Sequence, residues 1–214
     1  YPLDEIARSR LDSISNWQVE WKWDGIRAQL IKRGNEVVLW SRGQEMLTDQ
    51  FPEIVEEAAS WSGSIVLDGE LLAWDHDSPA PFSELQRRLG RKNVSVKMRN
   101  DVPILFMSYD LLEFDGVDFR NKSTQERRSI LQSWSSGISS RYFGISSLIE
   151  ACSWEVVLRL REESRRRRVE GIMLKRKEAP YHSGRKKGDW WKWKVAPYTI
   201  DAIMIPISPI IKKD

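Results

Sequence analysis

The stretch Glu-Trp-Lys-Trp-Asp-Gly-Ile-Arg occupies residues 20–27, and the rest of the chain can be interpreted outward from it. Apolar and polar side chains alternate over residues 19–22, which is the period of a β-strand. Asp-Gly at 24–25 predicts a tight turn, because glycine accepts a positive φ angle. The run from 26 to 31 predicts a second strand, so the pattern as a whole indicates a hairpin.

Lys22 is the candidate nucleophile of this stretch. The predicted hairpin places it at a strand end, close to the carboxylate of Asp24 and the guanidinium of Arg27. A lysine amine attacks only in its neutral form, and neighbouring positive charge together with partial burial favours that form. The alternative is an ordinary solvated hairpin edge, and the residues further along the chain decide between the two.

Composition narrows the class of protein. The 214 residues suffice for one large or two small domains, and 41% hydrophobic residues support a real core. No apolar run approaches the ~20 residues of a membrane span, so none is expected. Cys152 is the single cysteine, which excludes an intrachain disulfide and fits a reducing cytosol. With only two histidines besides, zinc chemistry is disfavoured. The chain begins with Tyr1 rather than Met, which predicts a piece of a longer protein.

The net charge of +3 is small, but the charges are unevenly distributed. Basic residues cluster at 87–99, 159–168 and 175–194, whereas acidic residues cluster at 49–57 and 110–118. A basic face of this kind is able to follow the phosphates of a nucleic acid.

Strands outnumber helices in the residue pattern. Strands are predicted at 18–22, 26–32, 36–40, 65–74, 101–114, 169–177, 190–195 and 198–207. Helices are predicted at 48–61, 82–91, 123–134 and 147–168. The two kinds of element do not alternate regularly, which favours an α+β fold with mainly antiparallel sheets over a doubly wound one.

Acidic residues stand on several predicted strands. Glu70 follows Asp-Gly between apolar neighbours, Glu170 precedes Gly171, and Asp110 lies in a third strand. A carboxylate is costly to bury unless it meets a cation or a metal, and an adjacent glycine lets a ligand approach closely. Solvent-facing acids on half-buried strands are the alternative.

Lys192 and Lys194 are two residues apart, so their side chains point to the same side of one strand. Like charges placed side by side favour an anionic ligand, of which phosphate is the obvious candidate. A basic exposed strand face is the alternative. The chain has neither a P-loop nor a GxGxxG motif, so a bound nucleotide would be held by side chains of opposing strands.

Five motifs in order resemble the nucleotidyltransferase family of ATP-dependent DNA ligases. They are Lys-x-Asp-Gly-x-Arg at 22–27, Asp-Gly-Glu at 68–70, Tyr-Asp-Leu-Leu at 109–112, Glu-Gly-Ile-Met-Leu-Lys at 170–175 and Trp-Lys-Trp-Lys at 191–194. Each is weak alone, and the ordered set is specific. The related capping enzymes share the first motif, but the stretches 41–52 and 82–91 favour DNA ligase.

The resemblance implies two mainly antiparallel sheets packed with flanking helices, with the nucleotide between them. Lys22 would attack the α-phosphate of ATP, expel pyrophosphate and hold AMP through a phosphoramide bond. Lys192 and Lys194 would neutralise the α-phosphate, and Arg42 would contact the nucleotide or the 5′-phosphate of DNA. Lys186 stands where arginine is common and would contact phosphate less specifically.

Other matching positions imply contacts to the nucleoside. Glu20 would lie beside the adenine, and Tyr109 and Met173 would sandwich it. Tyr109 stands where many relatives have phenylalanine, which also stacks. Arg27 and Glu70 would hold the ribose.

The resemblance also implies Mg²⁺, held by Glu70 or Glu170, and transfer of AMP to the 5′-phosphate of nicked double-stranded DNA. The 3′-hydroxyl would then displace AMP. The expected protein is a monomer inside the cell, cytoplasmic in a bacterium or archaeon and nuclear in a eukaryote. Residues 1–16 are expected to be a lead-in, 17–201 the adenylation domain, and 202–214 the last strand and a tail towards an OB-fold domain.

Two rival interpretations remain open. One is a sister enzyme, an RNA ligase or a guanylyl-transferring capping enzyme. The other is a basic nucleic-acid binding module that uses its eleven tryptophans for stacking and forms no adduct with a nucleotide.

Overall fold

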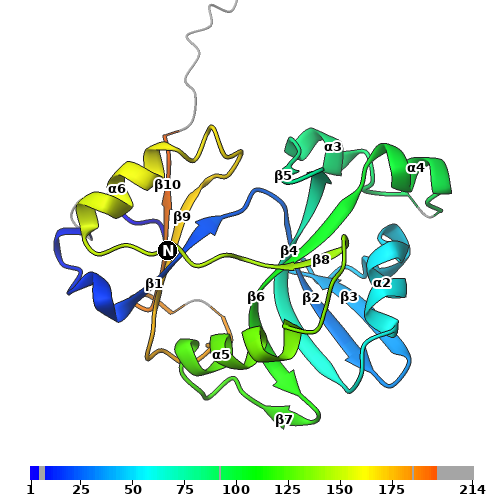
Figure 1. Cartoon of the computed structure of the whole chain (residues 1–214), viewed down its shortest axis with the longest axis horizontal. Coiled ribbons are helices and arrows are strands. Elements are labelled where there is room, and N and C mark those ends of the chain that lie inside the picture. Colours follow the sequence, from blue (N-terminus) through cyan, green and yellow to red (C-terminus); the bar gives the residue numbers. More distant parts are fainter. Residues whose placement is uncertain (5–7, 92, 185, 197–214) are drawn as a thin grey trace, which may run out of the picture.

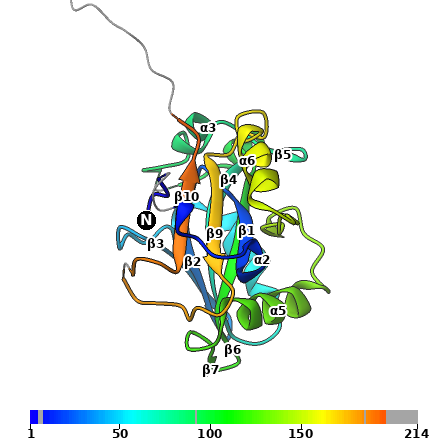
Figure 2. The same cartoon turned by 90° about the vertical axis from the view of Figure 1, so that its left-hand side faces the viewer.

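The computed structural model describes residues 1–4, 8–91, 93–184 and 186–196, which form two β-sheets with helices around them (Figure 1). The smaller sheet has the order β1-β9-β10, and Figure 2 shows β9 between the other two strands. Its strands are β1 (Trp17–Lys22), β9 (Gly171–Arg176) and β10 (Trp190–Lys194). All of its pairings are antiparallel.

The larger sheet has seven strands with the main order β3-β2-β4-β6-β7, to which β5 and β8 are attached. Its strands are β2 (Ile26–Arg33), β3 (Glu36–Ser41), β4 (Ile65–Asp75), β5 (Ser78–Pro79), β6 (Ile104–Phe114), β7 (Val117–Asp118) and β8 (Phe143–Ile145). Only the β6–β8 pairing is parallel among the strands described. The predicted α+β fold with two mainly antiparallel sheets is therefore confirmed.

The helices follow from local sequence signals. They are η1 (Ile14–Asn16), η2 (Thr48–Gln50), α2 (Pro52–Ala59), α3 (Phe82–Gln86), α4 (Val96–Asp101), α5 (Thr124–Ser135) and α6 (Trp154–Glu162). Ser123 and Glu126 form a complete capping box at the start of α5, as the sequence predicts. Within the described residues, no helix is long and apolar enough to span a bilayer.

The two larger of the three hydrophobic clusters in the described residues support the two sheets. The first lies against the seven-stranded sheet, where Phe51, Ile54 and Leu131 from η2–α2 and α5 pack with strand residues such as Phe106. The second lies behind the three-stranded sheet, where Val157 of α6 packs with inward-facing strand residues. A third, smaller cluster of Leu72, Leu105 and Met107 lies on the opposite face of the larger sheet. Strand alternation turns the other side chains of that face, among them Glu70, towards a cleft between the two sheets.

Several predicted elements differ from the structure. The predicted helix 147–168 is wrong over much of its length: only Trp154–Glu162 is α-helical, and Ser153 caps its start. Residues before it run along β1, where the Ile149 amide donates to the Val19 carbonyl at 2.8 Å. The predicted helix 48–61 begins as a 3₁₀ turn before Pro52, and the predicted helix 82–91 ends at Gln86. The predicted strand 198–207 lies outside the described residues.

The predicted hairpin at residues 24–25 is also wrong, because β1 and β2 belong to different sheets. Gly25 is not among the described residues with positive φ. A Cβ there would lie 2.3 Å from the Leu71 carbonyl oxygen and 2.7 Å from Cδ2 of Leu72. Glycine is needed for this close approach of the chain to β4, rather than for a turn.

We therefore expect Gly25→Ala to lower the free energy of unfolding by about 1–3 kcal/mol, because the new methyl group overlaps a backbone carbonyl that cannot move freely. Urea unfolding measures the change. Gly137→Ala is the matched control, since nothing lies within 4 Å of the Cβ position at Gly137. Equal effects of the two substitutions would contradict the close-packing explanation.

Candidate functional site

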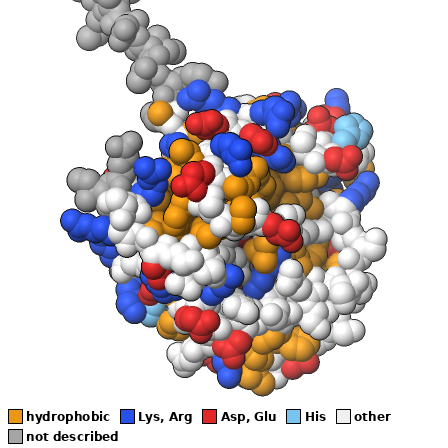
Figure 3. All heavy atoms as spheres, turned by 60° about the vertical axis from the view of Figure 1, so that its left-hand side comes forward, with side chains coloured by type: hydrophobic (Ala, Val, Ile, Leu, Met, Phe, Trp, Pro, Cys, Tyr) orange, Lys and Arg blue, Asp and Glu red, His pale blue; other side chains and the backbone are white. Residues whose placement is uncertain are grey.

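A cleft of about 740 Å³ lies between the two sheets. Every residue with a predicted role in binding or catalysis lines it: Glu20, Lys22, Arg27, Arg42, Glu70, Tyr109, Glu170, Met173, Lys186, Lys192 and Lys194. The strands that supply these side chains are far apart in sequence, and the sheet pairings bring them together. On the face seen in Figure 3, acidic and basic side chains border an apolar area, so charges of both signs surround it.

Lys22 lies at the end of β1, where Gly171 of β9 is paired with it in register. Gly171 is also paired with Lys194 of β10, so the two lysines flank one glycine on the central strand. A Cβ on Gly171 would lie 2.3 Å from the Trp193 carbonyl oxygen. Glycine at this position therefore lets β10 approach closely and brings the two amines to the same end of the sheet.

Glu170 lies between these two amines. Its Oε2 is 3.1 Å from Lys22 Nζ, and its Oε1 is 2.6 Å from Lys194 Nζ. Lys22 Nζ also donates to the Trp23 carbonyl at 2.7 Å. Burial opposes the charge of Glu170, but the two lysines hold its pKa below the usual value. The Lys22 amine is thus fixed by two acceptors at the floor of the cleft.

Glu70 is a buried carboxylate on the cleft face of β4, only 6% exposed. Burial raises its pKa to about 7, and the nearby charges of Asp68 and Glu170 act in the same direction. Within the described part of the chain it has no hydrogen-bond or ion-pair partner, in contrast to Glu170. A carboxylate in this state favours a ligand that brings positive charge or a donor.

Asp68 is fully buried and accepts hydrogen bonds from three side chains. Arg27 donates from Nε at 3.0 Å and from Nη2 at 2.5 Å. The hydroxyls of Tyr109 and Tyr181 donate at 3.3 Å and 2.9 Å. Asp68 therefore fixes Arg27 and Tyr109, which were predicted to contact the nucleotide. Its third partner, Tyr181, comes from the loop between β9 and β10.

Glu20 is 1% exposed and has two polar partners on the three-stranded sheet. Its Oε1 accepts from Gln18 Nε2 at 2.7 Å and pairs with Lys175 Nζ at 2.8 Å. The Lys175 ammonium lies 4.6 Å from the ring centre of Tyr109. Met173 is paired in register with Glu20 and lines the same cleft. Together these residues form the part of the cleft wall in which aromatic, thioether and polar groups meet.

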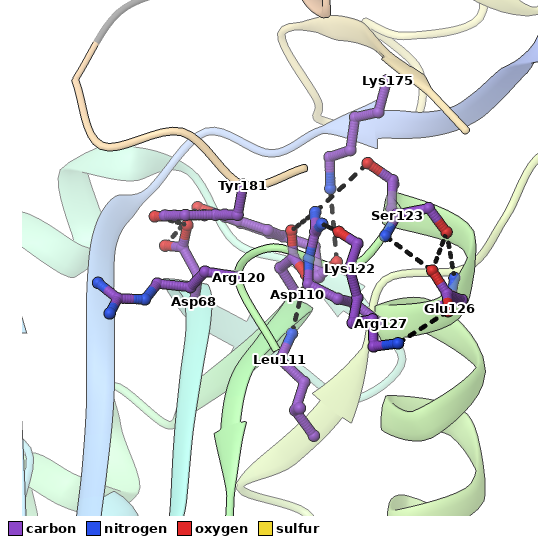
Figure 4. Close-up of polar contacts among 12 residues, drawn as sticks. Asp68, Asp110, Leu111, Arg120, Lys122, Ser123, Glu126, Arg127, Lys175 and Tyr181 are labelled. Carbon is purple, nitrogen blue, oxygen red and sulfur yellow. Dashed lines mark hydrogen bonds and ion pairs between the residues drawn. The ribbon is translucent and has the colours of Figure 1, made fainter. Parts of the chain in front are cut away.

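The remaining predicted residues differ in their surroundings. Lys186 is 59% exposed, and its Nζ lies 3.5 Å from Asp189 Oδ2. Arg42 lines the cleft near the end of β3, where its amide donates to the Arg27 carbonyl at 3.2 Å. Asp110 does not line the cleft. Its carboxylate forms a buried ion pair with Arg127 at 2.8 Å (Figure 4). Asp110 is therefore a structural acid.

Sequence reasoning missed three residues that organise the site. Asp68 stood in a quoted motif, and strand alternation from Glu70 could have placed it on the same face. Lys175 ends another quoted motif, two residues after Met173. Tyr181 carried no signal, because it lies in a loop and its hydroxyl reaches a sheet that is remote in sequence.

The chain matches the family described as the ATP dependent DNA ligase domain over residues 5–194. It is 33% identical to a probable DNA ligase of Koribacter versatilis, over 95% of this chain and 39% of that protein. It is 32% identical to a DNA ligase of Archaeoglobus fulgidus, over 95% of this chain and 37% of that protein.

Solved structures agree with this match. The ligase domain of LigD from M. tuberculosis aligns with a TM-score of 0.68 at 28% identity, over 85% of this chain and 56% of that one. A mycobacterial DNA ligase D complexed with ATP and MES aligns with a TM-score of 0.67 at 27% identity, over 85% of this chain and 55% of that one.

The cleft lies between two mainly antiparallel sheets, and the three-stranded sheet brings Lys22, Lys192 and Lys194 to it. The class of protein that this fold and site indicate is the nucleotidyltransferases. The chain belongs to the ATP-dependent DNA ligase domain family. It spans less than two fifths of the length of the curated relatives named here.

Proposed function

We propose that this chain is the adenylation domain of an ATP-dependent DNA ligase and that Lys22 is the residue that carries AMP. The observation that supports this most directly is the placement of the Lys22 amine 3.1 Å from Glu170, which in turn binds Lys194. An amine held at the floor of a cleft beside a second cation suits attack on a phosphate.

The proposed first step forms one bond and breaks one. Lys22 Nζ, after losing a proton to solvent, attacks the α-phosphorus of ATP, and the bond from that phosphorus to the pyrophosphate oxygen breaks. Lys192 and Lys194 lie on one face of β10 and would offset the charge that develops on the α-phosphate. Arg42 and Lys186, at the mouth of the cleft, would contact phosphate groups. Phosphoryl transfer of this kind depends mainly on positioning and charge neutralisation.

The nucleoside would lie further along the cleft. Glu20, whose carboxylate is held by Gln18 and Lys175, would accept a hydrogen bond from the exocyclic amine of adenine. Tyr109 and Met173 would contact the two faces of the base. Arg27 and Glu70 are neighbours in the β2–β4 register and would bind the ribose hydroxyls.

The carboxylates of the cleft also fit Mg²⁺, which usually takes one or two carboxylates together with phosphate oxygens. Glu70 is buried, faces the cleft and has no ionic partner in the described residues, so it would hold the ion. Glu170 would join it only after releasing Lys22 and Lys194 to the nucleotide. The ion would supply a Lewis acid for the phosphates. No group of three or more potential ligands from His, Cys, Asp and Glu occurs in the described residues, so substrate oxygens would complete the set.

In the second step we propose that AMP passes to the 5′-phosphate of nicked double-stranded DNA, after which the 3′-hydroxyl displaces it. The named relatives extend well beyond the length of this chain, so sealing would involve parts of the protein outside it. We further propose that the chain acts as a monomer inside the cell.

The test is formation of the protein–AMP adduct. We expect incubation with ATP and Mg²⁺ to add one AMP to the intact mass of the protein, and GTP to add nothing. Supplying nicked DNA or nicked RNA to the adduct then identifies the acceptor, with loss of AMP from the protein expected only with DNA. Labelling by GTP would favour a capping enzyme, and transfer to RNA alone would favour an RNA ligase. Tight DNA binding without any adduct would favour a binding module.

A further inference from the structure

Tyr181 connects the two sides of the cleft, although it belongs to neither sheet. It lies in the loop between β9 and β10, and its amide donates to the Arg120 carbonyl at 2.8 Å. Two residues earlier, the Ala179 carbonyl accepts from the Thr124 amide at 2.8 Å, at the first turn of α5. The backbone of Tyr181 is therefore held in place from the side of α5 (Figure 4).

The hydroxyl of Tyr181 completes a closed set of hydrogen bonds with Arg27 and Asp68. It accepts from Arg27 Nη2 at 3.0 Å and donates to Asp68 Oδ2 at 2.9 Å. Arg27 Nε binds the other Asp68 oxygen at 3.0 Å. Burial and the charge of Asp68 raise the pKa of Tyr181, so the phenol keeps the proton that it donates. These contacts fix the plane of the Arg27 guanidinium.

The ring of Tyr181 is fixed as well. It meets Trp190 edge to face at 5.8 Å between ring centres, and the Arg127 guanidinium lies 5.8 Å from its centre. Arg127 is in turn held by Asp110 in a buried ion pair. The Arg27 side chain keeps 37% of its surface exposed, so a ligand in the cleft can still reach it. The tyrosine thus orients a guanidinium that remains available.

We propose that Tyr181 is a positioning residue that, together with Asp68, aims the Arg27 guanidinium at the ribose hydroxyls of ATP and thereby sets the preference for a ribonucleotide over a 2′-deoxyribonucleotide. This inference rests on the function proposed above, in which Arg27 contacts the ribose. A guanidinium donates in fixed directions, so its orientation decides which hydroxyl it reaches. Holding that orientation before the nucleotide arrives saves the cost of ordering the side chain on binding.

The test is Tyr181→Phe in the whole chain, which removes one hydroxyl and keeps the ring against Trp190. We expect the KM for ATP in adduct formation to rise about tenfold, which corresponds to the loss of one charge-assisted hydrogen bond. The KM for dATP should change by less than about twofold. The rate at saturating ATP stays unchanged. The ratio of the two KM values is the decisive readout, because a merely structural role would weaken the binding of both nucleotides equally.

Two further variants make the result specific. Tyr142→Phe removes a hydroxyl that contacts Arg141 and should leave both KM values unchanged. In an Arg27→Ala background, Tyr181→Phe should have no additional effect on the calorimetric Kd for ATP or dATP, because Tyr181 acts through Arg27. Three results would each overturn the proposal. They are an equal rise of the KM for ATP and for dATP, unchanged KM values in Tyr181→Phe, and a full effect of Tyr181→Phe on Kd in the Arg27→Ala background. If the proposed function is wrong, the wild-type chain forms no adduct. In that case the calorimetric Kd values for ATP and dATP, compared between wild type and Tyr181→Phe, test this inference separately.

Discussion

Lys22→Ala is expected to abolish formation of the protein–AMP adduct, a loss on the order of 10³-fold or more, because the attacking atom is removed. Lys22→Arg should behave in the same way, since a guanidinium is not deprotonated in proteins. Binding of ATP should remain within about tenfold of the wild type, because the base and ribose contacts come from other strands. Intact mass and incorporation of α-labelled ATP measure the first effect, and calorimetry measures the second.

Lys97→Ala is the matched control, because Lys97 is an exposed lysine on α4 and does not line the cleft. It should label at the wild-type rate. Label that persists on Lys22→Ala would show that another residue is the nucleophile, while the membership of the chain in its family would stand.

Glu70→Gln is expected to change stability and activity in opposite directions. Burial raises the pKa of Glu70 to about 7 from an ordinary 4.5. Between pH 4.5 and about pH 7 the folded state therefore binds more protons than the unfolded state. Stability therefore falls as the pH rises through this window. At pH 8 the charged carboxylate costs at most about 3 kcal/mol, a cost that the neutral amide does not have. Adduct formation should fall by roughly 10²-fold, because the amide binds cations poorly.

Urea unfolding at pH 4 and pH 8 measures the stability of wild type and Glu70→Gln. The free energy of unfolding of the variant should exceed that of the wild type by about 1–3 kcal/mol at pH 8, and by much less at pH 4. Glu36→Gln, at an exposed position of β3, should show the same small difference at both pH values. A gain for Glu70→Gln that is independent of pH would contradict the assignment of the titrating group.

The strands were the most predictable part of the fold, and the site residues gathered as their motifs indicated. Alternation over residues such as 190–195 is a local property, so strand and face follow directly from it. Which sheet a strand joins is not local. The three residues that link β1 to β2 suit a hairpin as well as a crossover, and only the contact of Gly25 with β4 decides between them.

The failed helix prediction has a similar physical cause. Residues 147–152 have an acceptable helical composition, but the Ile149 amide and the Glu20–Leu148 bridge attach this segment to β1. Tertiary pairing outweighs a weak local propensity. Tyr181 could not be predicted for the same reason, since its importance depends on a contact with Asp68 across 113 positions of the sequence.

The link between the two sheets has a practical consequence. Residues 23–25 join them directly, with the Trp23 indole bonded to Ser146 at 3.0 Å and Gly25 pressed onto Leu71. Lys22 is the residue before this link, so a change in the angle between the sheets would move its amine without any separate mobile part. The distance from the Lys22 amine to Arg27 and Glu70 on the larger sheet would therefore change with the angle between the sheets.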